Sequence, residues 1–160
     1  MPSPLSIYLR NHEAAGRAGS DLFRRTVANH RDKPYAEDLA ELAAEVREDL
    51  DSVQTLMRRA GVQPDLLLGV ALRLGERVGR LKPNGRLVRR APLSDLIEIE
   101  LLVGAVQAKA AGWRALAAAG LGDHSGPLEI ATLIQRADKQ AERLAAIHRS
   151  VAAAVLTPIE

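Results

Sequence analysis

Apolar residues recur at alternating three- and four-residue steps over four long stretches of the chain, which is the spacing of one face of an α-helix. The first stretch runs from about Pro4 to Asn29 and the second from Tyr35 to Ala60. The third begins near Pro92 and fades at Ala117, and the fourth runs from Pro127 to Val155. At about 1.5 Å rise per residue, such helices are rods of roughly 40 Å. The pattern predicts an all-α bundle.

Proline marks the helix boundaries. Five of the eight prolines stand at the start of a stretch with helical spacing, and none interrupts such a stretch: Pro4, Pro34, Pro64, Pro92 and Pro127. Proline is tolerated in the first turn of a helix and is costly inside one. The proline that opens the middle of the chain predicts a fifth, shorter helix from about Pro64 to Leu81, followed by the turn Lys82–Arg86.

The connections predict two antiparallel hairpins. The short turn Asn29–Lys33 joins the first two long helices, and the glycine-bearing loop Gly120–Gly126 joins the last two. A shorter helix of 18 residues spans about 27 Å, so the segment between the hairpins can carry the chain from one end of the bundle toward the other. The second and third stretches would then be parallel. In an up-down-up-down bundle they would be antiparallel instead.

In helix number, helix length and this crossover, the chain resembles the ferritin-like superfamily. The resemblance implies a four-helix bundle of two hairpins joined by a long crossover, here with a shorter fifth helix, and a single domain over residues 1–160. It also implies iron or manganese, held by a carboxylate from each of two helices and a Glu-x-x-His pair from each of the other two. The sequence contains no Glu-x-x-His, so the metal site is expected to be absent or altered.

Composition narrows the function classes. The chain has 160 residues, 47% of them hydrophobic, and no cysteine, which excludes disulfides, thiolate metal sites and cysteine nucleophiles. Aromatic residues make up 2% of the chain, so a stacking platform for bases is not expected. Met1–Arg10 lacks the pattern of a secretory leader, and no uncharged run is long enough to span a membrane. We expect a cytoplasmic protein.

Several polar residues lie on or beside the apolar stripes and are candidates for an altered metal site: His12, Asp49, Glu100 and His148, with Glu45 and Gln107 near them. Carboxylates and imidazoles are the ligands that iron and manganese accept. No cofactor is expected if these side chains instead form hydrogen-bonded pairs that fix the helix register.

Counting residues along the predicted hairpins divides these candidates into two layers. His12 falls within about one turn of Asp49, with Gln107 at that level, whereas His148 falls within a turn of Glu100. The two layers are roughly 18 Å apart along the bundle, so one shared di-metal centre is not expected. The second layer is expected to include Glu45 as well.

Other polar residues have simpler interpretations. The acidic run Glu41–Asp51 is typical of a solvated helix face. Glu100 is flanked by apolar residues, so we expect it to be buried and paired with an arginine of another helix. His30 is expected to be a solvated residue at a helix end. Asp123–Gly126 contains triad residue types, but consecutive loop residues do not assemble a triad, and a plain loop is expected.

The crossover segment is strongly basic. Residues 64–90 carry a net charge of +5 and the rest of the chain −3. The basic residues are Arg73, Arg77, Arg80, Lys82, Arg86, Arg89 and Arg90. They suit an amphipathic surface helix with snorkelling arginines, and the alternative is an anion-binding segment for phosphates, nucleic acid or an acidic protein.

The function that the sequence favours is a non-enzymatic one. No phosphate-binding glycine loop and no nucleophile elbow occurs in the chain. We therefore interpret the protein as a structural or protein-interaction bundle, in which the alanine-rich face Ala105–Ala119 is a homodimer surface. The alternatives are a metal-binding or redox bundle and an anion or nucleic-acid binder that uses Arg73 to Arg90.

Overall fold

The computed structural model describes residues 1–65, 91–121 and 130–156. These residues form four α-helices: α1 (Pro4–Asn29), α2 (Ala36–Arg59), α4 (Pro92–Ala118) and α5 (Ile130–Val155). No strand occurs among them, so the all-α prediction is confirmed for the part of the chain that is described. The predicted helix at Pro64–Leu81 and the loop Asp123–Gly126 lie almost entirely outside the described residues.

Local sequence explains where the helices begin and end. The hydroxyl of Ser3 accepts a hydrogen bond from the amide of Ser6 at 3.2 Å, which caps α1, and Pro4 follows at the first helical position. Pro92 opens α4 in the same way. Gly61 and Gly120 follow the ends of α2 and α4 with φ of 64° and 76°. Glycine adopts this left-handed conformation without the steric cost of a Cβ, so both helices end there.

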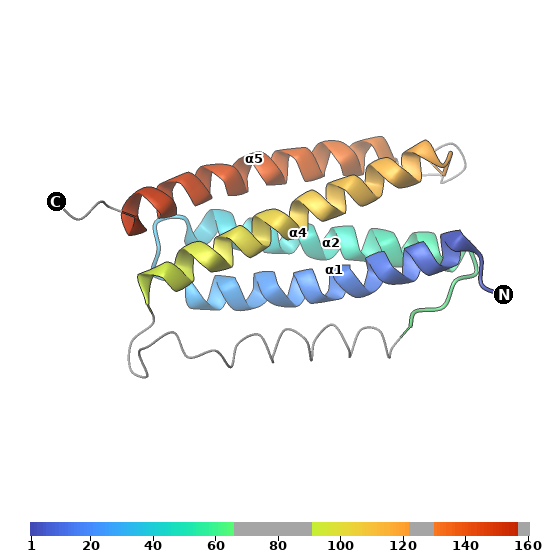
Figure 1. Cartoon of the computed structure of the whole chain (residues 1–160), viewed down its shortest axis with the longest axis horizontal. Helices are drawn as coiled ribbons and strands as arrows, with labels where there is room; N and C mark the ends of the chain where they lie inside the picture. The colour runs from blue at the N-terminus through green and yellow to red at the C-terminus, as the bar shows by residue number, and fades with distance from the viewer. Residues whose placement is uncertain (66–90, 122–129, 157–160) are drawn as a thin grey trace.

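The helices pack as two hairpins. α1 lies against α2 and α4 lies against α5, while α1 and α4 make a smaller contact between the hairpins. Figure 1 shows that α2 and α4 run in the same direction, each antiparallel to its own hairpin partner. The end of α2 and the start of α4 therefore lie at opposite ends of the bundle. This is the parallel arrangement that the length of the connecting segment predicts, and the up-down-up-down alternative is wrong.

The hydrophobic core is divided into two clusters. One, which we call the α2-end cluster, contains Leu9, Met57, Trp113 and Leu133 near the end of α2. The other, which we call the α2-start cluster, contains Phe23, Leu42, Ile99 and Leu144 near the start of α2. Two of the buried polar residues, Asp49 and Gln140, lie at the middle level of the bundle. The candidate site lies at this middle level, where polar residues separate the two apolar clusters.

Candidate binding cavity

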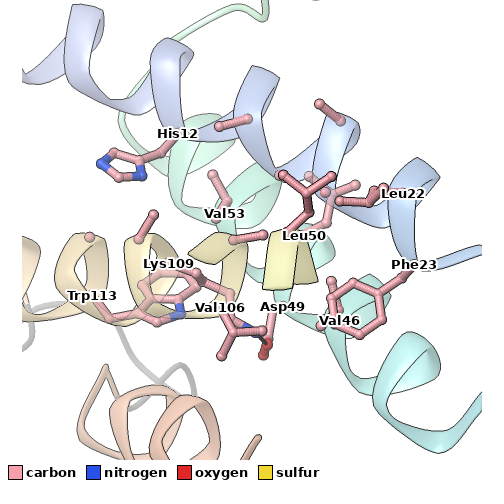
Figure 2. A pocket seen from close by; sticks show the side chains of 18 of the residues that line it. His12, Leu22, Phe23, Val46, Asp49, Leu50, Val53, Val106, Lys109 and Trp113 are labelled. Carbon is pink, nitrogen blue, oxygen red and sulfur yellow. Dashed lines mark hydrogen bonds and ion pairs between the residues drawn. The ribbon is translucent and has the colours of Figure 1, made fainter. Parts of the chain in front are cut away.

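A cavity of about 430 Å³ lies between α1, α2 and α4. Figure 2 shows its wall: His12, Leu22 and Phe23 come from α1, Leu50 and Val53 from α2, and Val106, Lys109 and Trp113 from α4. Most of the lining is apolar, and the polar side chains are those of His12, Asp49 and Lys109. A volume of this size falls within the range of about 300–1,000 Å³ that is usual for small-molecule sites.

The α1 wall of the cavity is the middle of the apolar stripe that the sequence predicts to point inward. Ala15, Gly16 and Gly19 line the cavity, while Leu9 and Phe23, toward the two ends of the stripe, belong to the two core clusters. A Cβ added at Gly19 would meet no described atom within 4 Å. Because these side chains are so small, they leave a hollow where larger ones would fill the seam between α1 and α4.

His12 borders this hollow and packs on the opposite helix. Its ring lies 4.3 Å from that of Tyr8, centroid to centroid, and a Cβ at Gly112 of α4 would come within 2.7 Å of its Cε1 atom. The glycine on α4 therefore makes room for the imidazole. Burial lowers the pKa of His12 from its ordinary value of 6.5, which favours the neutral ring at pH 7.

The floor of the cavity is an ion pair. Asp49, which is 1% exposed, accepts hydrogen bonds from Lys109 and, at 3.3 Å, from Gln140 of α5, and it forms a salt bridge with Arg136. Lys109 also donates to the side-chain oxygen of Gln140. Burial lowers the pKa of Lys109, and the carboxylate of Asp49 offsets part of that shift. Two cations thus surround one buried carboxylate, and these contacts connect the three helices α2, α4 and α5.

This network continues along the outer edge of α2 and α5. Arg143 donates to Asp38, to Glu41 at 2.8 Å and to Glu45 at 2.7 Å, and Gln140 donates to Glu45 at 2.9 Å. Burial acts against the charge of Arg143, but its carboxylate partners outweigh this effect and raise its pKa.

The acidic run is only partly the solvated face that the sequence predicts. Glu41, Glu48 and Asp51 are exposed as expected, although Glu41 and Glu48 also form ion pairs with α5. Glu45 is half-buried and Asp49 is buried, each against cationic side chains, so for these two residues the expectation is wrong. Acidic residues that recur every three to four positions lie on one face of a helix, and that face can pack against a basic helix face as well as face solvent.

The second predicted layer is partly confirmed. His148 and Glu100 meet at 3.2 Å, as the counting along the hairpin predicts. Glu100 is exposed and not buried with an arginine, so that expectation is wrong. Glu45 lies with Gln140 and Arg143 and not in this layer. Gln107 is exposed, although Lys109, two residues along, does reach Asp49.

His30 is a buried junction. Its side chain is 0% exposed, with Nδ1 2.9 Å from the Tyr35 hydroxyl and Nε2 3.1 Å from Glu98 of α4. The prediction of a solvated residue is therefore wrong, although His30 does end α1 as the C-cap. At this end of the bundle it links the first hairpin to the second.

The sequence-based reasoning also missed Lys109, Arg136, Gln140 and Glu13. Glu13 is buried and accepts hydrogen bonds from Arg17 and, at 3.2 Å, from Gln54. A signal for Lys109 exists in the sequence, because it continues the three- and four-residue steps of Leu102, Val106 and Trp113. Spacing alone places a residue on a face, but it does not reveal a partner on a helix far away in the chain.

The four candidate metal ligands form no common centre. His12 and Asp49 line the cavity, while Glu100 and His148 pair elsewhere. Within residues 1–65, 91–121 and 130–156, no group of three or more His, Asp or Glu side chains could hold a metal ion. The seven basic residues from Arg73 to Arg90 lie outside the described residues.

Comparisons with known proteins do not add to these observations. No protein-family model, curated protein sequence or solved structure matches the chain. Among the described helices, none combines the length and the apolar character that crossing a membrane requires.

Proposed function

We propose that this chain is a non-enzymatic helical bundle that acts by binding, and that the cavity between α1, α2 and α4 is its binding site. The observation that carries the proposal is the hollow of about 430 Å³ between α1, α2 and α4. Apolar walls that no side chain covers forgo the stabilisation that burial gives, at about 25 cal/mol per Å². A bound apolar molecule would recover it.

The test uses the full chain and an environment-sensitive apolar dye, 1-N-phenylnaphthylamine. Trp113 lines the cavity and is the one tryptophan of the sequence, so its emission reports occupancy independently of the dye. We expect saturable dye binding with a matching change in Trp113 emission. A dye signal without any change at Trp113 would place binding elsewhere.

A matched pair of variants locates the site. Gly19→Leu projects a side chain from the α1 wall into the cavity, whereas Gly104→Leu adds the same side chain on exposed α4 surface that does not line it. Neither added Cβ meets a described atom within 4 Å. We expect Gly19→Leu to abolish dye binding and Gly104→Leu to leave it unchanged. Equal binding by both variants would contradict the proposal.

A second candidate function is self-association through α4, the homodimer that the sequence favours. Leu93 and Ile97 are exposed on one face of α4, and Ala111 and Ala115 continue that face. A helix that is apolar on all sides is usually buried on all sides, and a second copy of the chain would cover this one. Light scattering should give twice the monomer mass, and Ile97→Glu should return it to the monomer value.

The ferritin-like relationship is also part of the proposal. The common direction of α2 and α4, with their connected ends at opposite ends of the bundle, supports it. An altered iron or manganese site that uses His12, Asp49, Glu100 or His148 stays a prediction, and elemental analysis of protein purified without chelator tests it. Anion or nucleic-acid binding by Arg73 to Arg90 likewise stays a prediction, for which binding should weaken steeply with salt.

A further inference from the structure

We propose that the cavity holds an uncharged, single-chain aliphatic molecule whose hydroxyl or other neutral polar head lies at the His12 end. This inference rests on the proposed function, because it names the ligand class of the same site. Three properties of the cavity support it: its shape, the charges on its wall and the state of His12.

The shape of the cavity is that of an extended chain. Its lining on α1 begins at His12 and ends at Phe23, a distance of about 16 Å at 1.5 Å per residue. On α4 the lining extends from Leu101 to Leu116, so the cavity is elongated along the helices. An extended hydrocarbon chain suits a cavity that is elongated in this way. At about 1.3 Å of advance per carbon–carbon bond, an extended chain of about twelve carbons spans the length.

Small residues on both sides keep this channel open. Gly16 and Gly19 line the cavity from α1, and Ala105 and Ala108 line it from α4. None of these four residues carries a polar side chain, so this part of the wall offers dispersion contacts and no side-chain hydrogen bonds. A polar group in the middle of a ligand chain would lose its water without gaining a partner there.

The charges on the wall are already compensated. Lys109 pairs with Asp49, and Arg136, the second cation at Asp49, also pairs with Glu48, so an ionic ligand would find no counter-ion that is not engaged. A charged head group would then lose its hydration without an equivalent partner. The wall therefore selects against both carboxylates and ammonium groups.

His12 supplies the polar contact. The structure shows no hydrogen bond from either of its ring nitrogens to a described residue, and burial favours its neutral form by lowering its pKa. A neutral imidazole carries one donor and one acceptor, which match the acceptor and donor of a single hydroxyl group. The head of the ligand is accordingly placed where α1 and α4 hold the imidazole, next to Gly112.

The experiment compares four probes of equal chain length by displacement of 1-N-phenylnaphthylamine from the full protein at pH 8, each below its aggregation concentration. The probes are 1-dodecanol, dodecane, dodecanoate and dodecylammonium. We expect 1-dodecanol to bind most tightly, about tenfold more tightly than each of the others, the effect of roughly one net hydrogen bond or one uncompensated charge. Tighter binding of either ion would overturn the ligand class.

Two variants of His12 test the head-group contact. His12→Leu should weaken 1-dodecanol about tenfold and leave dodecane unchanged, and His12→Gln, which keeps a donor and an acceptor, should restore most of the difference. Circular dichroism checks that each variant is folded. Loss of dodecane and 1-dodecanol binding in equal proportion would contradict the role of His12.

Failure of this inference and failure of the proposed function give different results. If the ligand class is wrong, the dye still binds, Gly19→Leu still abolishes its binding, and an ionic probe displaces it best. If the proposed function is wrong, neither the dye nor any of the four probes changes Trp113 emission, and Gly19→Leu behaves like Gly104→Leu.

Discussion

The two hairpins contact each other along two seams, α1 with α4 and α2 with α5, and the side chains in these seams are of opposite kinds. The seam between α1 and α4 is lined by Gly16, Gly19 and Ala105 and encloses the cavity, whereas the edge between α2 and α5 is closed by ion pairs around Arg136 and Arg143. Ion pairs depend on distance and geometry, so they fix how the hairpins align. Small apolar side chains impose no such alignment and leave space. One seam thus holds the bundle in register while the other is available for a ligand.

The largest effect on stability is expected at Asp49, where the ion pairs between α2 and α5 reach the core. Asp49→Asn removes the buried carboxylate that Lys109 and Arg136 share, and it should lower the free energy of unfolding by about 3–5 kcal/mol because two partly buried cations lose their common partner. Urea unfolding measures this. Glu48→Gln is the matched control, since Glu48 contacts the same arginine from an exposed position, and it should cost less than about 1 kcal/mol. Equal costs would show that burial of Asp49 has no special role.

The next largest effect on stability is expected from a comparison of two glycines in the seam between α1 and α4, Gly112 and Gly19. Gly112→Ala should lower the free energy of unfolding by roughly 1–2 kcal/mol, because the new Cβ would come within 2.7 Å of His12 and force its ring to move. Gly19→Ala has no described atom within 4 Å of its Cβ, so it should raise the free energy of unfolding by about 0.5–1 kcal/mol through helix propensity. Thermal unfolding compares the two. A lower free energy of unfolding for Gly19→Ala would mean that other atoms already fill the seam at this position.

A smaller effect is expected at the outer edge of the charged seam. Arg143→Met removes contacts to Asp38, Glu41 and Glu45 and should cost about 1–2 kcal/mol at low ionic strength, with a smaller cost in 1 M salt. Arg114→Met, which breaks an exposed pair with Asp138, should cost no more than a few tenths. If salt leaves the cost of Arg143→Met unchanged, packing and not charge accounts for it.

The smallest effect is a pH dependence of the free energy of unfolding, which comes from His12 at one end of the cavity. The pKa of His12 is lower in the folded chain than its ordinary 6.5, so below about pH 6.5 the unfolded chain binds a proton that the folded chain does not. The free energy of unfolding should therefore fall as the pH decreases through that window. His12→Gln should show a shallower decrease in urea unfolding between pH 7 and 5. Parallel profiles would assign the dependence to other groups.

Much of the fold could be predicted from local patterns. The helix that the sequence predicts at Pro4–Asn29 has those same bounds, and Pro92 opens α4 as expected. The pairing of His148 with Glu100 follows from residue counting across a hairpin, because the rise per residue of an α-helix is constant. These predictions depend on backbone geometry within one helix or one hairpin, and a single sequence contains that information.

The candidate site could be predicted only in part. His12 and Asp49 were recognised as inward polar residues, but Lys109, Arg136 and Gln140 were not. The charge of Lys109 argues for a surface position unless its partner is known, and that partner lies 60 residues earlier in the chain. His30 has the same difficulty, because its partner Glu98 belongs to the other hairpin.

The sequence by itself determined four long helices, boundaries of these helices at proline and glycine, and their pairing into two hairpins. Only the tertiary structure decided that α2 and α4 run in the same direction, that the middle of the stripe on α1 faces a hollow and that the acidic face of α2 meets the arginines of α5. The physical reason is that helical spacing places side chains around one axis. Whether a face meets a core, a cavity or an opposite charge depends on the distance and rotation between two axes, which spacing along one helix does not encode.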